Sequence, residues 1–135
     1  MAQNTSPVFS LVPETKVGII TAASASKVPA SATNLVTLVT GDTDGTKVTR
    51  IGFKWDGTSY AGSIQIYITD TAGANPILFD EILTTAITSS NTVASWQSVN
   101  TYNDLQLKSG QLIKVGCMVL TAGQISCYAS IGDFS

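Results

Sequence analysis

The chain has 135 residues, enough for one domain that buries roughly 65 to 70% of the surface exposed by the unfolded chain. Only 12% of the residues are charged, so the polar surface consists mainly of Thr, Ser, Asn, Gln and Gly. The net charge is -2, and the six Lys and one Arg are scattered singly. This distribution excludes the basic stripe that nucleic-acid binding requires.

No apolar run approaches the roughly 18 to 20 residues of a membrane span, and the first residues lack the basic and apolar regions of a signal peptide. We therefore expect no membrane partner and synthesis in a cytoplasm. The two cysteines, Cys117 and Cys127, are too few for a disulfide scaffold. Without any His they do not complete a Cys/His zinc site, so neither a metal nor a cofactor is predicted.

The first 16 residues are predicted to form an extended arm, because Pro7 and Pro13 exclude a regular helix. The domain organisation is then an arm at residues 1–16 and a β-sandwich at residues 17–135, with a first strand at residues 17–22. The arm either lies along its own domain or packs on a neighbouring subunit, and both interpretations stay open. Its candidate partner-binding residues are Val8, Phe9, Leu11 and Val12.

Residues 34–40 are apolar on both sides, which predicts a strand covered on both faces or placed at an oligomer contact. The next loop, residues 41–45, reads Gly-Asp-Thr-Asp-Gly. Asp-x-Asp-Gly resembles the start of a calcium loop, but the other oxygen ligands and the distal Glu are missing. A plain Asp-Gly turn is the favoured interpretation.

Residues 46–70 contain two stretches with the period-2 alternation of half-buried strands. We expect these strands to lie side by side in one layer. Val48 is assigned to the outer side of the first strand, and Gln65 and Tyr67 to the outer side of the second. The residues assigned to the core are Thr49, Ile51, Phe53, Trp55, Ile64, Ile66 and Ile68.

Residues 77–83 favour a strand over a helix capped by Asn75, because the Thr-rich sequence that follows is a poor helix former. The inward side of this strand is not predicted. Weak alternation around Trp96 indicates a further strand at residues 93–99, and residues 105–107 form a short one.

Residues 111–120 and 124–131 are predicted to form a hairpin around the loop Thr121-Ala122-Gly123. In this register Cys117 lies opposite Cys127. Two free thiols packing as small hydrophobic groups are the favoured interpretation, with a cross-strand disulfide or a functional thiol as alternatives. The eight side chains expected to face the core are Ile113, Val115, Cys117, Val119, Ile125, Cys127, Ala129 and Ile131.

Eight or nine strands, regular turn signals and no convincing helix predict an all-β fold. The expected architecture is a single-domain antiparallel β-sandwich, jelly-roll-like, with an extended N-terminal arm. The order of the strands is not predicted.

Catalytic chemistry lacks its usual residues, because His is absent and Lys and Glu are scarce. The acidic pairs Asp80–Glu81 and Asp42–Asp44 are expected to point to opposite faces or into solvent. We predict no enzymatic activity and no catalytic residue. A lectin-like, carbohydrate-binding sandwich is the alternative, and its candidate aromatic residues are Tyr60, Tyr67, Trp96, Tyr102 and Tyr128.

Six short motifs follow one another in a characteristic order: Gly-Thr-Lys-Val-Thr-Arg-Ile at 45–51, Ser-Ile-Gln-Ile-Tyr-Ile at 63–68, Ile-Leu-Phe-Asp-Glu-Ile at 77–82, Leu-Gln-Leu at 105–107, Gln-Leu-Ile-Lys-Val-Gly at 111–116 and Ile-Gly-Asp-Phe at 131–134. This order and spacing resemble a group of short tailed-bacteriophage virion proteins. The resemblance covers residues 34–135 and leaves the arm out. Ile131 stands where that group usually has another small residue.

The resemblance implies a capsid decoration, auxiliary capsid or head-fibre protein without enzymatic activity, often a homotrimer. Its implied partners are the major capsid protein, other virion proteins and copies of itself, with surface glycans as the partner in the lectin alternative. The implied location is the capsid surface of the virion, after synthesis in the host cytoplasm. A tail or baseplate position is equally compatible with the residues.

Overall fold

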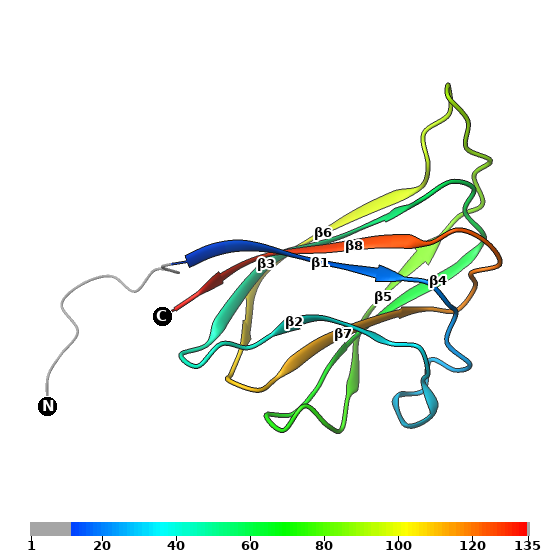
Figure 1. Cartoon of the computed structure of the whole chain (residues 1–135). Helices are drawn as coiled ribbons and strands as arrows, with labels where there is room; N and C mark the ends of the chain where they lie inside the picture. The colour runs from blue at the N-terminus through cyan, green and yellow to red at the C-terminus, as the bar shows by residue number, and fades with distance from the viewer. Residues whose placement is uncertain (1–11, 135) are drawn as a thin grey trace, which may run out of the picture.

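The computed structural model describes residues 12–134, which fold into two four-stranded antiparallel sheets stacked face to face (Figure 1). One short 3-10 helix, η1, lies between the first two strands. The elements in chain order are β1 (Val12–Ile20), η1 (Pro29–Ser31), β2 (Val36–Thr40), β3 (Thr46–Trp55), β4 (Gly62–Ile68), β5 (Ile77–Thr84), β6 (Gln97–Leu107), β7 (Leu112–Cys117) and β8 (Ile125–Asp133).

The strand order is β1-β8-β3-β6 in the first sheet, here sheet A, and β2-β7-β4-β5 in the second, sheet B. Four of the antiparallel pairs are β1 with β8, β2 with β7, β3 with β6 and β4 with β5. The chain thus resembles one long antiparallel hairpin that has been rolled into two layers, which is the jelly-roll topology. The predicted all-β, jelly-roll-like sandwich is confirmed.

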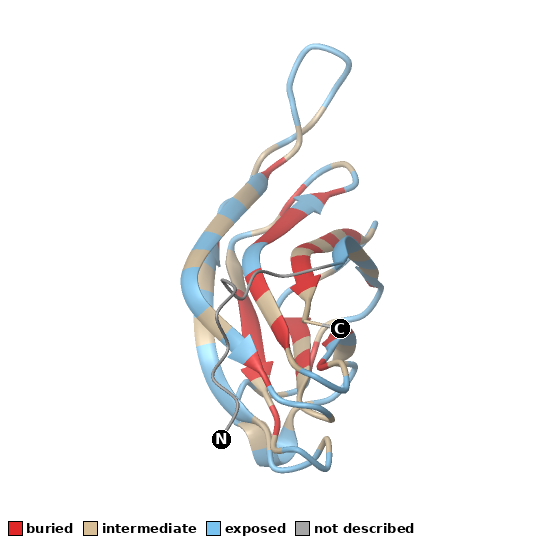
Figure 2. Ribbon diagram, turned by 90° about the vertical axis from the view of Figure 1, so that its left-hand side faces the viewer, coloured by how far each residue is buried: buried red, intermediate tan, exposed pale blue. Residues whose placement is uncertain are grey.

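The core lies between the two sheets, where Figure 2 shows the buried residues. Every second residue of the central strands faces it, because successive side chains of a strand point to opposite sides. At one end of the core the indole ring of Trp55 makes edge-to-face contacts with Tyr60 and Trp96. The largest fully buried apolar side chains of this core are Trp55, Phe53, Ile20, Ile51, Ile64, Ile66, Ile113, Ile125, Val39 and Val48.

Two predicted strand pairings are wrong. Strands β3 and β4 do not lie in one layer, because β3 belongs to sheet A and β4 to sheet B. The hairpin of β7 and β8 is absent for the same reason: β7 pairs with β2 and β4, whereas β8 pairs with β1 and β3. Two strands with one apolar face each bury those faces equally well side by side or across the core, so alternation alone did not distinguish the two arrangements.

Bulges in β3 and β2 change which of their residues face the core, compared with the prediction. The register of β3 shifts between Val48 and Arg50, which leaves Thr49 exposed and turns Val48 into the core. A similar shift between Thr37 and Val39 buries two consecutive residues, Leu38 and Val39. β2 is therefore an edge strand with a bulge. Of the two predicted alternatives, cover along both faces is wrong, and a place at an oligomer contact stays a prediction.

The bounds of two strands also differ from prediction. β1 begins at Val12, where it pairs with Asp133, so residues 12–16 belong to sheet A and not to an arm outside the sandwich. Pro13 is tolerated because β1 is an edge strand, which needs no ladder hydrogen bond on its outer side. β6 is one strand of 11 residues where two short strands were predicted, and its residues 102–104 bulge opposite Thr49.

The two ends of the sandwich differ. The start of β1 and the end of β8 lie at one end, together with the turns β2–β3 and β6–β7 (Figure 1), and the backbone N–H of Phe134 donates there to the carbonyl of Gly45. At the opposite end, residues 85–96 form a long loop that protrudes beyond both sheets (Figures 1 and 2). Its tip is a tight turn closed by a backbone pair between Ser90 and Val93.

Candidate interaction surface

The acidic pair of β5 is divided between the two faces of the strand, as predicted. The Asp80 carboxylate accepts a 2.8 Å hydrogen bond from the hydroxyl of Tyr102, which lies on β6 of the other sheet. The Glu81 carboxylate pairs with Lys27 at 3.1 Å and accepts a hydrogen bond from the Gln65 amide. Both acids are therefore held in structural contacts and do not form a carboxylate pair.

The Asp-x-Asp-Gly loop forms a turn, which confirms the favoured interpretation. The backbone N–H of Gly45 donates to the carbonyl of Asp42 at 2.9 Å, and Gly45 has a φ of 99°, which glycine adopts without strain. The Thr46 hydroxyl bonds the Asp133 carboxylate at 2.7 Å and fixes the C-terminal strand beside the turn. Within residues 12–134, no three His, Cys, Asp or Glu side chains are grouped so that they could hold a metal ion.

The two thiols are free and buried, as the favoured interpretation predicted. They do not lie opposite each other in one sheet: Cys117 lies across from Ile64 in sheet B, and Cys127 from Phe53 in sheet A. Burial raises the pKa of Cys117 to about 11 and that of Cys127 to about 12. Because the thiolate is the reactive form, both are inert in the folded protein.

A thiol reagent such as DTNB at pH 8 is expected to modify neither Cys117 nor Cys127 in the folded chain. Both thiols become reactive when the chain is unfolded in guanidinium chloride, because unfolding removes the burial that suppresses the thiolate. The absorbance of the released thiolate measures the extent. Rapid modification of the native protein would show that at least one cysteine is accessible.

Alkaline pH is expected to destabilise the fold. Burial, and then the hydrogen bond and charge of Asp80, raise the pKa of Tyr102 above its usual range, and the pKa of both thiols is raised as well. Between about pH 9 and 12 the folded state therefore keeps protons that the unfolded state releases. The contribution of these groups to the free energy of unfolding is fully present below this window and is lost as pH rises through it. Thermal unfolding from pH 8 to 11 measures the decline, and a constant melting temperature would contradict it.

The aromatic candidates for carbohydrate binding are mostly engaged in packing. Trp96 is 8% exposed and Tyr67 is fully buried. Tyr60 packs on Trp55, and Tyr102 contacts Phe79 at a ring-centroid distance of 5.5 Å. Only Tyr128 spreads its ring over an outer face, so the structure does not bring these residues together into one platform.

Part of the outer face of sheet B is covered by the chain itself. Residues 21–35, which join β1 to β2, fold over it, and the Tyr67 hydroxyl donates a 2.7 Å hydrogen bond to the carbonyl of Lys27. Gly116 approaches the Leu35 side chain so closely that a Cβ would lie 2.6 Å from it. Tyr67 and Gln65 do lie on the outer side of β4 as predicted, yet the loop removes both from solvent.

Strand β5 exposes most of its apolar side chains. It is an edge strand of sheet B, and of its eight residues only Thr84 is buried. Leu83 is 76% exposed and Ile77 62%. Edge strands of soluble proteins rarely leave a row of large apolar side chains uncovered. The exposed residues, here called the β5 surface, are Ile77, Leu78, Phe79 and Leu83.

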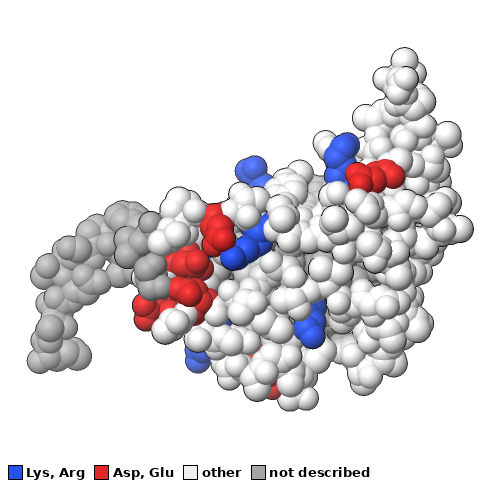
Figure 3. Space-filling model, in the orientation of Figure 1, with Lys and Arg blue, Asp and Glu red and all other residues white. Residues whose placement is uncertain are grey.

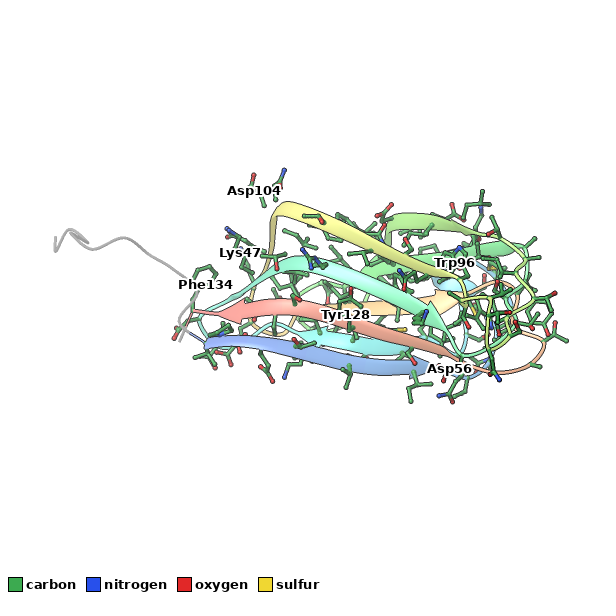
Figure 4. The ribbon with its side chains drawn as sticks, turned by 90° about the horizontal axis from the view of Figure 1, so that it is seen from above. Lys47, Asp56, Trp96, Asp104, Tyr128 and Phe134 are labelled. Atoms are coloured by element: carbon green, nitrogen blue, oxygen red, sulfur yellow. The ribbon has the colours of Figure 1, made fainter. Side chains whose placement is uncertain are left out.

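The outer face of sheet A carries a second apolar group, which Figure 4 shows from above. The register aligns Val17, Tyr128, Gly52 and Val99 in one row across the four strands. Gly52 allows the Tyr128 ring to lie flat, because a Cβ at position 52 would overlap that ring. Val17 and Val99 are 77% and 52% exposed, and Ile19 lies beside the row.

The cations of β3 flank this row. Lys47, Arg50 and Lys54 pair with outward positions of β8, so they lie on the outer face of sheet A. None of the paired outward positions of this sheet is Asp or Glu. Asp104, in the β6 bulge, lies at the margin of the sheet (Figure 4). The sheet A surface is the set Val17, Ile19, Lys47, Arg50, Lys54, Val99 and Tyr128.

The predicted arm residues lie mostly outside the described residues. Val8, Phe9 and Leu11 fall in residues 1–11, whereas Val12 opens β1 and is 46% exposed. Acidic side chains gather at this end of the molecule, where Glu14, Asp42 and Asp133 raise the pKa of Lys16 (Figure 3). Elsewhere the face in this view is largely uncharged. The same end has an open hollow of about 810 Å³, to which Leu107 and Phe134 contribute apolar atoms.

Neither apolar surface was identified from the sequence. A pattern that points to such a surface was present in β5. Its apolar residues occupy both faces of the strand, so the side facing the core was not predicted. A strand buried on both faces and an edge strand at a contact surface share this pattern, and only the position of the strand distinguishes them.

No family model matches the sequence, and no curated protein matches it. In residues 12–134 no helix is long and apolar enough to cross a membrane.

Proposed function

We propose that this chain is a non-enzymatic structural component of a bacteriophage virion. In this proposal it is a capsid-associated decoration or head-fibre protein that docks on the major capsid protein through its N-terminal residues Val8, Phe9, Leu11 and Val12 and associates with copies of itself. The observation that carries the proposal is a charge-poor jelly roll whose uncovered apolar side chains lie on rigid strands. Such surfaces serve contacts between proteins.

The polarity of the sandwich supports this arrangement. Val12 lies at one end and the protruding loop of residues 85–96 at the other (Figure 1). A chain attached through residues 1–12 would therefore present that loop away from the attachment point. The non-enzymatic part of the proposal has separate support, because the carboxylates of Asp80, Glu81 and Asp133 are held in hydrogen bonds that stabilise the fold.

The fold alone does not select this function, since jelly rolls occur in viral capsid proteins and in lectins. The motif order described above, which resembles phage virion proteins, favours the first. Tyr67 and Trp96, two candidates for sugar stacking, are buried, which weighs against the second.

Mass spectrometry and cryo-electron microscopy of purified phage particles that encode this chain test the proposal. We expect the chain in many copies per particle, with density for the sandwich on the capsid surface. Absence from purified virions would refute a structural role, and density on the tail would support a tail or baseplate protein instead. A glycan array with the purified chain tests the lectin alternative: binding that Tyr60→Ala or Tyr102→Ala abolishes would favour it.

A further inference from the structure

We infer that the sheet A surface binds an acidic glycan, with a sugar ring stacked on Tyr128 and a sugar carboxylate bound by Arg50. This assigns a ligand class to a face that the proposed function leaves without one, and it does not rest on that function. Three observations carry it. An aromatic ring lies flat on the sheet, cations flank that ring, and the polar groups around it have no partner within the fold.

The Tyr128 ring forms the centre of a narrow apolar band. Gly52 lets the ring lie directly on the backbone of β3, because a Cβ at that position would overlap it. The register places Val17 and Val99 at the two ends of the same row, and both are exposed. The face of an aromatic ring is negative, so it attracts the C–H groups that line one face of a sugar ring.

Cations lie on both sides of this band. Arg50 and Lys54 each stand two residues from Gly52, which is about 7 Å along a strand. The bulge of β3 adds Lys47 to the same face, because all three cations pair with outward positions of β8. An arginine guanidinium matches the geometry of a carboxylate and binds it through paired hydrogen bonds. A sugar that stacks on the ring and carries a carboxylate therefore meets a cation at its edge.

The charges and donors of this face are available to a ligand. Within residues 12–134 the Arg50 guanidinium and the Tyr128 hydroxyl make no ion pair and no hydrogen bond. The Glu14 carboxylate, at the edge strand, is paired with Lys16 at 2.8 Å. Asp104 lies at the margin of the sheet, away from the Tyr128 ring (Figure 4). An anion at the ring would therefore meet an uncompensated positive charge.

Two other kinds of anionic partner fit this face less well. Nucleic acid is held by a longer basic stripe than the three cations of β3, and the net charge of the chain is -2. A protein partner covers roughly 800 Å² with a broad apolar centre. Here the apolar band is one residue wide, and the rows beside it contain Ser126 and Ser130. Hydroxyls next to a narrow apolar band match the edge of a sugar ring, which carries hydroxyls of its own.

Two substitutions test the two contacts. Tyr128→Ala removes the stacking ring, and Arg50→Gln removes the cation and keeps a polar side chain. Arg50 is exposed, so Arg50→Gln should fold with unchanged thermal unfolding even if Tyr128→Ala does not fold. Tyr128→Phe keeps the ring and removes only the hydroxyl. Lys108→Gln is the matched control for charge, because Lys108 is exposed in the turn between β6 and β7, outside the sheet A surface.

Isothermal titration of the purified full-length chain with oligogalacturonate, a linear chain of sugar carboxylates, measures the affinity. Its methyl ester is the neutral probe with the same rings. We expect the acid form to bind, and binding at least about tenfold weaker for the methyl ester, for Arg50→Gln and for Tyr128→Ala. Tyr128→Phe and Lys108→Gln should stay within about twofold of the wild type, since both keep the ring and the guanidinium.

No binding of the acid form by the wild type would overturn the inference, and so would equal binding of the methyl ester or an equal loss in Lys108→Gln. Equal binding of oligothymidylate would overturn it in favour of a site for any polyanion. Density for another protein over Tyr128 in the particle map would assign the face to a protein contact instead. The presence of the chain in virions is measured separately, so either proposal can fail while the other stands.

Discussion

Replacing Ile66 by Ala is expected to lower the free energy of unfolding by about 2 to 5 kcal/mol, the cost of deleting a buried aliphatic side chain that leaves a cavity. Ile66 is fully buried on β4, which lies between β7 and β5 in sheet B. Its neighbours belong to paired strands, so the surrounding structure collapses only partly around the missing atoms. Guanidinium denaturation followed by the fluorescence of the buried Trp55 and Trp96 measures the change.

Leu83→Ala is the matched control for this substitution. Both positions are aliphatic residues of sheet B, yet Leu83 is 76% exposed, so we expect a change within about 0.5 kcal/mol in dilute protein. A loss at Leu83 as large as that at Ile66 would show that β5 contributes to the core of the single chain. A loss that appears only at high protein concentration would instead report an effect on association.

Removing residues 1–11 is expected to leave the sandwich folded and to reduce attachment to the particle at least about tenfold, in line with the loss of several buried apolar contacts. All eight strands lie within residues 12–134, so the sheets do not need the deleted segment. Circular dichroism and thermal unfolding test the fold. Quantitative mass spectrometry of particles grown with the truncated chain measures occupancy.

The position of the cut decides what this experiment reports. Val12 and Pro13 pair with Asp133 and Gly132, so a cut after Pro13 would also shorten β1 and confuse lost attachment with lost stability. A full-length chain with Val8, Phe9 and Leu11 changed to Ser is the matched variant, because it keeps the length and removes only the apolar contacts. Full occupancy by either form would contradict docking through these residues.

The strands themselves could be predicted with few errors, because each central strand carries its own apolar alternation. Ile64, Ile66, Ile113 and Val115 were assigned to the core from period 2 alone, and all four are buried. One error in the assigned faces arose where a residue is inserted: the bulge at Thr49 exchanged Val48 for Thr49 in the core. The assignments after the bulge, Ile51, Phe53 and Trp55, were right, and those of Val48 and Thr49 were exchanged, because no distinctive residue marks the bulge.

The candidate surfaces depended on information that local sequence lacks. Leu83 and Ile82 are neighbours with similar side chains, yet Leu83 is exposed because its position opposite Ser63 faces outward at the edge of sheet B. Tyr67 looked like an outward residue and is buried, because residues 21–35 fold back across it. Both outcomes are set by segments that lie far away in the sequence.

The sequence by itself determined an all-β sandwich with a charge-poor exterior, because alternation and turn chemistry act between residues a few positions apart. Only the tertiary structure decided which strands became neighbours, which faces stayed open and where the cations of β3 meet an apolar row. Those outcomes follow from pairings such as β1 with β8 and β3 with β6, which join residues as far apart as Val12 and Asp133 and leave no periodic trace in the chain.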